Sequence, residues 1–395
     1  MTREAFDLVI VGGGLAGGLI ALSVQQRLPE LSLALIETGK SFGGNHRWSW
    51  FEGDIGAEGE TLLAPFEKTV WTGGNDVHFP GYSRRLAAEY RSLDSRDFDD
   101  ALRRELPQSA IFAGCRAGEI GAGGVRLQSG EDLPARAVID CRDAGPSPHL
   151  TGGWQVFLGQ HLRTAAPHGI ERPVIMDATV VQPGAYRFVY LLPLGTHEIF
   201  VEDTYYADSP ALDADLMRKR IANYAADRGW RTEVLHEETG VLPVVTGGDF
   251  TAYRASLERP GVALAGARGG FTHPLTSYTM PIAVENALAI ADMAHLPGPA
   301  LANAVAARAT RHWADTAYYR LLAKMLFDAA EPSKRYTIFE RFYRLPEPLI
   351  ERFYAARSTP ADKARILSGK PPVKIGRAIR AILGKGAPLV HMERR

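Results

Sequence analysis

Three glycines near the N-terminus are spaced for dinucleotide binding. Gly12, Gly14 and Gly17 occupy the G-x-G-x-x-G positions after an apolar run, residues 6–10. In a strand–turn–helix–strand unit, the first glycine permits a tight turn, the second lets the backbone approach a pyrophosphate, and the third lets helix and strand pack closely. Glu37 ends the next apolar run, twenty residues past the last glycine, where it can accept hydrogen bonds from a ribose diol. The spacing therefore predicts a dinucleotide site.

The helix that follows these glycines would direct its first N–H groups at the same anion. The backbones of Leu15 and Ala16 lie in this first turn. The loop after Glu37 contains Gly44 and Asn45, followed by aromatic side chains that are costly to leave exposed. By analogy with flavoproteins, we expect this loop to fold back over the cofactor.

Two further segments have the pattern of cofactor contacts. Asp140 ends an apolar strand pattern and begins Asp-x-Arg-x-x-Gly, which is either a second cofactor-contacting segment or an ordinary turn at a strand end. Downstream, a third apolar run leads through a glycine-rich loop into a helix predicted from about residue 280. In flavin enzymes of the hydroxylase superfamily, a loop in this position binds the ribityl chain and the isoalloxazine. Its candidate contacts are Gly266, Gly270, Pro274, Ser277 and Tyr278.

Neighbouring carboxylates could carry acid–base chemistry. Glu202 and Asp203 follow an apolar run and precede two tyrosines, an environment that can desolvate a carboxyl group and raise its pKa. An acid that stays protonated near neutral pH can donate a proton to an alkene. Glu237 and Glu238 form a second acidic pair. For both pairs the alternative is ordinary carboxylates in water at a strand end.

Hydrophobic periodicity divides the chain into segments that would position these groups. We predict a cofactor-binding domain formed by residues 1–150 and 251–300, interrupted by a β-rich substrate domain at 151–250 and followed by a helical region at 301–395. The predicted fold class is α/β, a Rossmann-type FAD-binding domain of the flavin hydroxylase and glutathione-reductase-like superfamily with an antiparallel β insert.

Composition excludes several other classes. Zero formal net charge gives no reason to expect a nucleic-acid partner, and only two cysteines argue against a disulfide framework or a cysteine-rich metal site and fit a reducing compartment. We expect no metal site, no transmembrane run of about 20 apolar residues and no signal peptide before the first strand. Residues 361–395 carry nine Lys or Arg against two acids. This tail suits either an anionic lipid surface or a packed helix with a solvated basic face.

Longer motifs in the chain closely resemble bacterial lycopene β-cyclases. The matching segments cover essentially the whole chain: residues 9–18, 43–49, 188–193, 202–206, 238–243, 272–278, 341–348 and 367–372. The resemblance implies an FAD enzyme that closes both ends of lycopene into β-rings, giving γ-carotene and then β-carotene. It also implies that the flavin works in its reduced form, with NAD(P)H as reductant and no net redox change, and that Glu202 is essential.

Because lycopene lives in the bilayer, this resemblance implies a cytoplasmic protein attached peripherally to the inner face of the cell membrane. Glu238 could then orient the first acid or take the ring proton. Two other functions remain open on the same fold: an FAD-dependent isoprenoid reductase or monooxygenase, and a non-enzymatic prenyl-lipid carrier. Ala267 and Arg268 stand where many flavin hydroxylases have an acid, which weakens the hydroxylase alternative.

Overall fold

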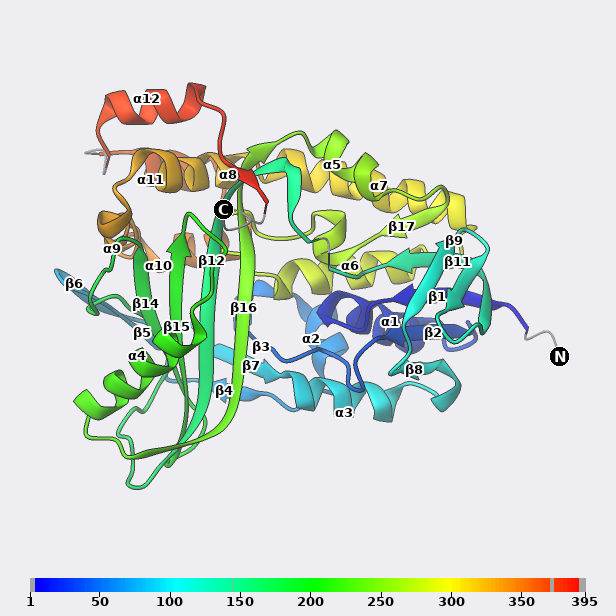
Figure 1. Cartoon of the computed structure of the whole chain (residues 1–395), viewed down its shortest axis with the longest axis horizontal. Coiled ribbons are helices and arrows are strands. Elements are labelled where there is room, and N and C mark those ends of the chain that lie inside the picture. The colour runs from blue at the N-terminus through cyan, green and yellow to red at the C-terminus, as the bar shows by residue number, and fades with distance from the viewer. Residues whose placement is uncertain (1–3, 144, 370–372, 391–395) are drawn as a thin grey trace.

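The computed structural model describes residues 4–143, 145–369 and 373–390. Figure 1 shows a parallel sheet flanked by helices beside a long antiparallel sheet, with the C-terminal helices above the antiparallel sheet. The predicted α/β fold with an antiparallel insert and a helical C-terminal region is confirmed. Lys370, Arg394 and Arg395 of the basic tail lie outside the described residues.

The first sheet is the predicted dinucleotide-binding sheet. Its first two strands are parallel and flank the glycine turn, as the apolar runs predict. The fourth strand along the sheet, β11, is long enough to pair with the hairpin β9–β10 at its start and with β1 and β17 at its end. The sheet comprises β1 (Phe6–Val11), β2 (Leu33–Glu37), β8 (Ile111–Ala113), β9 (Ala117–Gly121), β10 (Gly124–Leu127), β11 (Asp132–Asp140) and β17 (Val262–Leu264).

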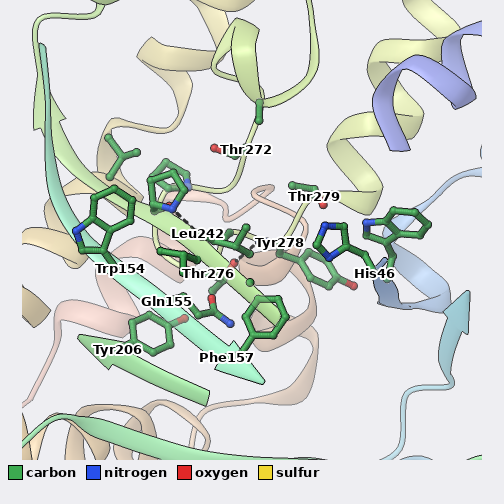
Figure 2. Close-up of a pocket in the computed structure, with 18 of the residues that line it drawn as sticks. His46, Trp154, Gln155, Phe157, Tyr206, Leu242, Thr272, Thr276, Tyr278 and Thr279 are labelled. Atoms are coloured by element: carbon green, nitrogen blue, oxygen red, sulfur yellow. Dashed lines mark hydrogen bonds between the residues drawn. The ribbon is translucent and has the colours of Figure 1, made fainter. Parts of the chain in front are cut away.

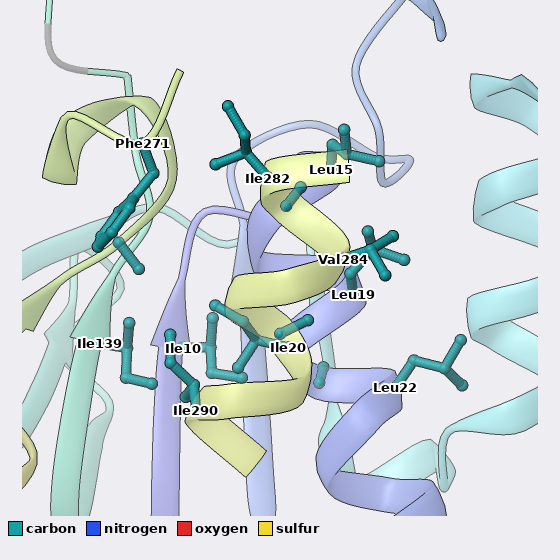
Figure 3. Close-up of a cluster of buried hydrophobic side chains, with 14 of the residues drawn as sticks. Ile10, Leu15, Leu19, Ile20, Leu22, Ile139, Phe271, Ile282, Val284 and Ile290 are labelled. Atoms are coloured by element: carbon teal, nitrogen blue, oxygen red, sulfur yellow. The ribbon is translucent and has the colours of Figure 1, made fainter. Parts of the chain in front are cut away.

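Helices bury one face of this sheet. In Figure 3, Ile10 and Ile139 point from β1 and β11 toward two adjacent helices, on which Ile20 and Ile290 pack. The close approach requires Gly17, because a Cβ there would lie 1.9 Å from the carbonyl oxygen of Gly12. The helices of this part are α1 (Leu15–Arg27), α2 (Ala57–Leu63), α3 (Ser95–Glu105), α5 (Phe250–Leu257), α6 (Met280–Asp292) and α7 (Gly298–Asp315).

The second sheet contains the long strands predicted in the β-rich segment. Its order is β16-β12-β15-β14-β13-β5-β6, and β18 pairs with β12. The predicted short hairpin at residues 195–197 joins β14 to β15. The strands are β5 (Asn75–Phe79), β6 (Tyr82–Leu86), β12 (Ser147–Thr164), β13 (Val174–Asp177), β14 (Tyr186–Pro193), β15 (Glu198–Ala207), β16 (Thr232–Gly248) and β18 (Pro388–Leu389).

Two parts of this sheet come from outside residues 151–250. Strand β5 pairs in parallel with β13, which brings residues 75–86 into the second sheet, and β18 adds the C-terminal end of the chain. Backbone pairing of this kind crosses the predicted boundary of the β-rich domain at residues 151–250. The division of the chain into four consecutive segments stays a prediction. A third small sheet lies beside the cavity described below: β3 (Arg47–Phe51), β4 (Thr69–Trp71) and β7 (Tyr90–Asp94).

Helices cover both faces of the antiparallel sheet. Helix α4 (Ala214–Asp227) packs on one face through Met217 and Ile221. The opposite face meets an aromatic core that includes Tyr186 and Phe339. The C-terminal helices are α8 (Ala317–Lys324), α9 (Tyr336–Phe342), α10 (Glu347–Tyr354), α11 (Pro360–Leu367) and α12 (Ile375–Leu383). None of the helices in the described ranges is both long and apolar enough to cross a membrane.

A buried arginine joins the helical region to the sheet. Arg335 is 1% exposed and donates hydrogen bonds to the carbonyls of Leu326, Phe327 and Tyr206 and to the Asp208 carboxylate. Tyr206 belongs to β15, so the guanidinium fixes the C-terminal helices against the strand that carries Glu202. The helical region is therefore part of the framework of the candidate site.

Candidate active site

The glycine turn has the shape of an anion cradle. Gly12 has a φ of +102°, and a Cβ there would lie 2.9 Å from the backbone nitrogen of Arg142, so the turn is closed on that side. Among the described residues, a Cβ on Gly14 would meet no atom within 4 Å. No side chain caps the N-terminus of α1. The first N–H groups of the helix, those of Leu15 and Ala16, are therefore available to a pyrophosphate in the open space beside Gly14.

Glu37 is held at the edge of the same cradle. One carboxylate oxygen accepts a hydrogen bond from the Gly13 N–H (2.9 Å) and the other accepts one from the Gly39 N–H (2.7 Å). A carboxylate has about four lone-pair sites, so these two bonds leave capacity for ribose hydroxyls. The residues present therefore fit a bound dinucleotide.

Three other predicted cofactor residues lie away from this cradle or are engaged elsewhere. Gly44 has a φ of +67° and turns the loop toward β16. The Asn45 side chain donates to the Glu237 carbonyl (2.8 Å) and contacts His236, so it ties the loop to β16. Asp140 is fully buried and forms ion pairs with Arg142 (2.7 Å) and Arg268 (3.1 Å).

These contacts determine the protonation state of Asp140. Burial alone would raise the pKa of Asp140, but the hydrogen bond from Arg142 and the charge of Arg268 hold it below its usual range. The side chain is thus an ionised anchor for two arginines, and the structure does not bring it to the cavity that the other candidates line. These contacts fit the second interpretation of the sequence, in which Asp140 belongs to an ordinary turn at the end of a strand.

A cavity of about 780 Å³ lies between the loop at residues 266–279 and the antiparallel sheet. Figure 2 shows Thr272, Thr276 and Tyr278 of this loop on one side, facing Gln155, Phe157 and Tyr206 of the sheet. The predicted residues Gly270, Pro274, Ser277 and Tyr278 all line it, whereas Gly266 packs against Ala16 of α1. Ser277 has a φ of +54°, and its hydroxyl donates to the Pro243 carbonyl (3.0 Å), so the loop is pinned to β16.

Two carboxylates meet in this cavity. Glu202 on β15 and Glu238 on β16 both pair with Gly159 of the intervening strand β12, so they lie in one row across three strands. Both side chains line the cavity. The glycine between them contributes no side chain, and its space is taken by the Phe200 ring, which would lie 2.3 Å from a Cβ at that position. The two acids are therefore held on one face next to an apolar ring.

Their surroundings favour protonation. Burial, with a smaller contribution from the charge of Asp203, raises the pKa of Glu202 to about 7 despite the hydrogen bond from the Thr204 hydroxyl (2.6 Å). Burial and then the negative charge of Glu202 raise the pKa of Glu238 to about 9, against the opposing charge of Arg47. Two desolvated carboxyl groups that repel each other when ionised keep at least one proton between them near neutral pH.

Asp203 does not belong with these acids, which corrects its selection as a catalytic candidate. It lies on the opposite face of β15, where it is fully buried and pairs with Arg187 at 2.6 Å, and it accepts a hydrogen bond from the Tyr205 hydroxyl (3.0 Å). Successive side chains of a strand point to opposite faces, so adjacent Glu202 and Asp203 cannot share a cavity. This alternation was readable from the sequence.

The second acidic pair is divided in the same way. Glu237 points outward, forms an ion pair with Arg218 (2.6 Å) and accepts a hydrogen bond from the Gln160 amide (2.8 Å). Glu238 is 5% exposed and points inward. Arg47, close to Glu238, is itself paired with Asp94 at 2.7 Å. Of this pair, only Glu238 lines the same cavity as Glu202.

Aromatic and polar residues that were not selected as candidate site residues complete the lining. Phe157, Tyr190 and Tyr206 share the cavity face of the sheet with Glu202. Asp54, which is 1% exposed, accepts hydrogen bonds from the hydroxyl of the lining residue Tyr278 and from the Phe51 N–H (3.0 Å), and burial raises its pKa to about 7. Strand alternation could have found the three aromatic residues, but nothing local marks Asp54. No group of three metal-ligating side chains occurs in the described ranges.

Comparisons with known proteins agree on one family. A sequence model of the lycopene cyclase protein family matches residues 7–380. Among curated proteins, the chain is 46% identical to a lycopene β-cyclase of Pseudescherichia vulneris, covering 95% of this chain and 97% of the relative, and 39% identical to one of Pantoea ananas, covering 96% and 98%.

The solved structures share only the fold. A geranylgeranyl bacteriochlorophyll reductase-like protein from Thermoplasma acidophilum superposes over 96% of each chain with a TM-score of 0.56 and 13% identity. A flavin-dependent brominase covers 89% of this chain and 94% of its own, with a TM-score of 0.57 and 16% identity. The extent of the family match and the identity to the curated relatives show that the chain belongs to the lycopene cyclase family.

Proposed function

We propose that this protein is a lycopene β-cyclase that closes both ψ ends of lycopene into β-rings, giving γ-carotene and then β-carotene. The carrying observation is the pair of protonatable carboxyl groups, Glu202 and Glu238, on one face of an aromatic cavity. The loop that borders this cavity begins at Gly266, which packs against Ala16 of the dinucleotide cradle. The names of the relatives at 39–46% identity support the same reaction.

The reaction needs one acid and one base. A proton added to the terminal C=C of a ψ end forms a tertiary cation, the neighbouring alkene attacks that cation and closes the ring, and loss of a ring proton leaves the product. One proton enters and one leaves, so no electrons are gained or lost. In this proposal Glu202 donates the first proton in its neutral form. Glu238, whose pKa is raised to about 9, orients Glu202 while protonated and receives the ring proton only when it is ionised.

The cavity supports the cation in two ways. The rings of Phe157, Tyr190 and Tyr206 can present their π faces to positive charge, and such contacts gain strength where water is excluded. An ionised carboxylate of the acid pair adds negative charge on the same face. Burial of the pair keeps water from competing with the alkene for the cation.

We propose FAD as the cofactor, bound by the Gly12–Gly17 turn, the first turn of α1 and Glu37, with Pro274, Ser277 and Tyr278 along the flavin side. When bound and reduced by NAD(P)H, FAD supplies negative charge to a cation beside it. The chain's own part is to position the cofactor: the uncapped N–H groups of Leu15 and Ala16 face its pyrophosphate, and Glu37 faces its ribose.

The test is an anaerobic incubation of purified protein with lycopene, FAD and NADPH. We expect β-carotene to accumulate without matching NADPH loss, because the flavin needs reduction only once. Stoichiometric NADPH consumption would indicate the alternative reductase or monooxygenase, and a protein that binds no flavin and makes no product would indicate a carrier.

Two matched substitutions test the acids. Glu202→Gln and Glu238→Gln preserve shape and hydrogen bonding but remove the proton-donating and accepting carboxyl groups. We expect cyclisation to fall by about 100-fold or more for Glu202→Gln. Glu237→Gln is the control, since this neighbour of Glu238 faces Arg218 outside the cavity. Normal β-carotene formation by Glu202→Gln would overturn the assignment.

We also propose that the protein attaches to the cytoplasmic face of a membrane through α12. Exposed Lys374 directly precedes this helix, exposed Arg380 lies in its last turn, and Ile379 is 53% exposed, a combination that suits anionic lipid. Changing Lys374 and Arg380 to Gln should reduce sedimentation with phosphatidylglycerol vesicles. Changing Lys219 and Arg231 to Gln removes the same charge from the distant α4 region and should not. Equal sedimentation of the two double variants would contradict the proposal.

A further inference from the structure

A second cavity of about 300 Å³ lies under α12. We call it the α12 groove, and its lining includes Leu322, Met325, Phe342, Ile366 and Ile379. Among the described residues that line it, all are apolar except Arg341, whose guanidinium donates to the Ser368 carbonyl. Ile379 lines the groove from α12 and is 53% exposed. A groove of this composition suits a chain without a charged headgroup.

The α12 groove lies back to back with the main cavity. Leu275 lines the groove, while its neighbours Pro274 and Thr276 line the cavity. The same division separates Phe342 from Tyr343, and Phe353 from Tyr354, with the phenylalanines on the groove side and the tyrosines on the cavity side. At these three positions the two spaces are thus lined by neighbouring residues of the same segments.

The cavity side of this partition carries a side-chain hydrogen bond, whereas the groove side is apolar. The hydroxyls of Tyr343 and Tyr354 lie 2.6 Å apart and hold each other in place. Phe342 and Phe353 contact through ring centroids 4.6 Å apart, and neither they nor Leu275 can form side-chain hydrogen bonds. A hydrocarbon that passes at these three positions would therefore meet apolar side chains and would not compete with side-chain hydrogen bonds of theirs.

We propose that the α12 groove holds the portion of an elongated isoprenoid hydrocarbon that extends beyond the main cavity, with the chain crossing the partition at Leu275, Phe342 and Phe353. The inference rests on the proposed function, since it concerns the rest of a substrate whose end group lies near Glu202. Because the proposed flavin ring and the reacting end group share the main cavity of about 780 Å³, the rest of a long carotenoid needs an apolar path outward. Helix α12 forms the outer wall of that path, anchored by the Arg377–Glu331 ion pair (3.2 Å).

Filling the groove tests this assignment. Ala378 lines the groove from α12, so Ala378→Trp would occupy it without changing the main cavity. Leu383→Trp is the matched control, because Leu383 lies on the same helix, is 81% exposed and does not line the groove. Each variant is assayed with lycopene and with a C20 acyclic polyene that carries one ψ end and is short enough for the main cavity.

We expect Ala378→Trp to raise KM for lycopene by about tenfold or more, since each buried methylene excluded from the groove weakens binding about fourfold. KM for the short polyene should stay within about twofold, and Leu383→Trp should resemble wild type with both. An equal effect of Ala378→Trp on long and short substrates, or no effect on either, would overturn the proposal.

A binding measurement separates this inference from the proposed function. In the Glu202→Gln background, lycopene that co-elutes with the flavin-loaded protein in gel filtration is measured by its visible absorbance. Less retained lycopene with Ala378→Trp than with Leu383→Trp supports the groove even if the wild-type protein forms no β-ring. Retention of phospholipid instead of lycopene, lost with Ala378→Trp, would assign the groove to lipid acyl chains and overturn the proposal.

Discussion

Glu238→Gln should slow cyclisation and at the same time stabilise the folded protein at alkaline pH. Glu238 is 5% exposed, and burial together with the charge of Glu202 raises its pKa from 4.5 to about 9. Between these two pH values the folded protein binds a proton that the unfolded chain does not. Stability therefore falls as pH rises through this window, and the loss disappears when the carboxyl group is replaced by an amide.

The size follows from linkage. One proton of difference changes the free energy of unfolding by about 1.4 kcal/mol per pH unit. Between about pH 5 and pH 8, the free energy of unfolding of wild type relative to Glu238→Gln should therefore fall by on the order of 3 to 4 kcal/mol. Coupling to Glu202 spreads the transition over both acids, so the change belongs to the pair.

Urea unfolding of the FAD-saturated proteins at about pH 5, 6.5 and 8 measures this change. Glu237→Gln is the control: hydrogen bonds from Arg218 lower the pKa of Glu237, so its stabilising contribution is complete above its unfolded pKa and lost only at acidic pH. Its effect should be below about 1 kcal/mol and constant across this range. If the difference in free energy of unfolding between wild type and Glu238→Gln did not grow with pH, the conclusion that buried Glu238 holds a proton would be refuted.

Three further outcomes follow from other contacts. Gly14→Ala should change the free energy of unfolding of the flavin-free protein by no more than about 1 kcal/mol, but it should weaken FAD binding at least tenfold in a fluorescence titration. Gly17→Ala should itself lower the free energy of unfolding by about 2 kcal/mol or more, because its Cβ would meet the backbone. Asp203→Asn should lower the free energy of unfolding by about 3 kcal/mol, since it leaves the Arg187 charge buried without its partner. The kcat of the folded enzyme should stay within about threefold of wild type. A loss of kcat as large as that of Glu202→Gln would indicate that Asp203 takes part in catalysis. Arg335→Ala should lower the urea midpoint, with a loss of about 3 kcal/mol from three unpaired carbonyls, and an unchanged midpoint would contradict its role in joining helices and sheet.

Where short-range rules act, the sequence alone was sufficient. The glycine spacing and the apolar runs predicted β1, α1, β2 and Glu37, because a turn, a helix start and a strand end are determined by neighbouring residues. The same holds for the hairpin at residues 195–197 and for the loop at 266–279, whose residues Gly270, Pro274, Ser277 and Tyr278 reach the cavity. The resemblance to family motifs further predicted that Glu202 is essential.

Only the tertiary structure decided which acids meet. Glu202 and Glu238 are distant in sequence and become neighbours because β15 and β16 both pair with β12 in a register that places Gly159 between them. The separation of Asp203 and Glu237 from them, by contrast, follows from strand alternation, which was readable from the sequence. The addition of β5 and β6 to the second sheet and the backing of the α12 groove against the cavity also depend on contacts between distant segments. Such contacts follow from strand register and from how whole elements pack, which no local pattern of residues specifies.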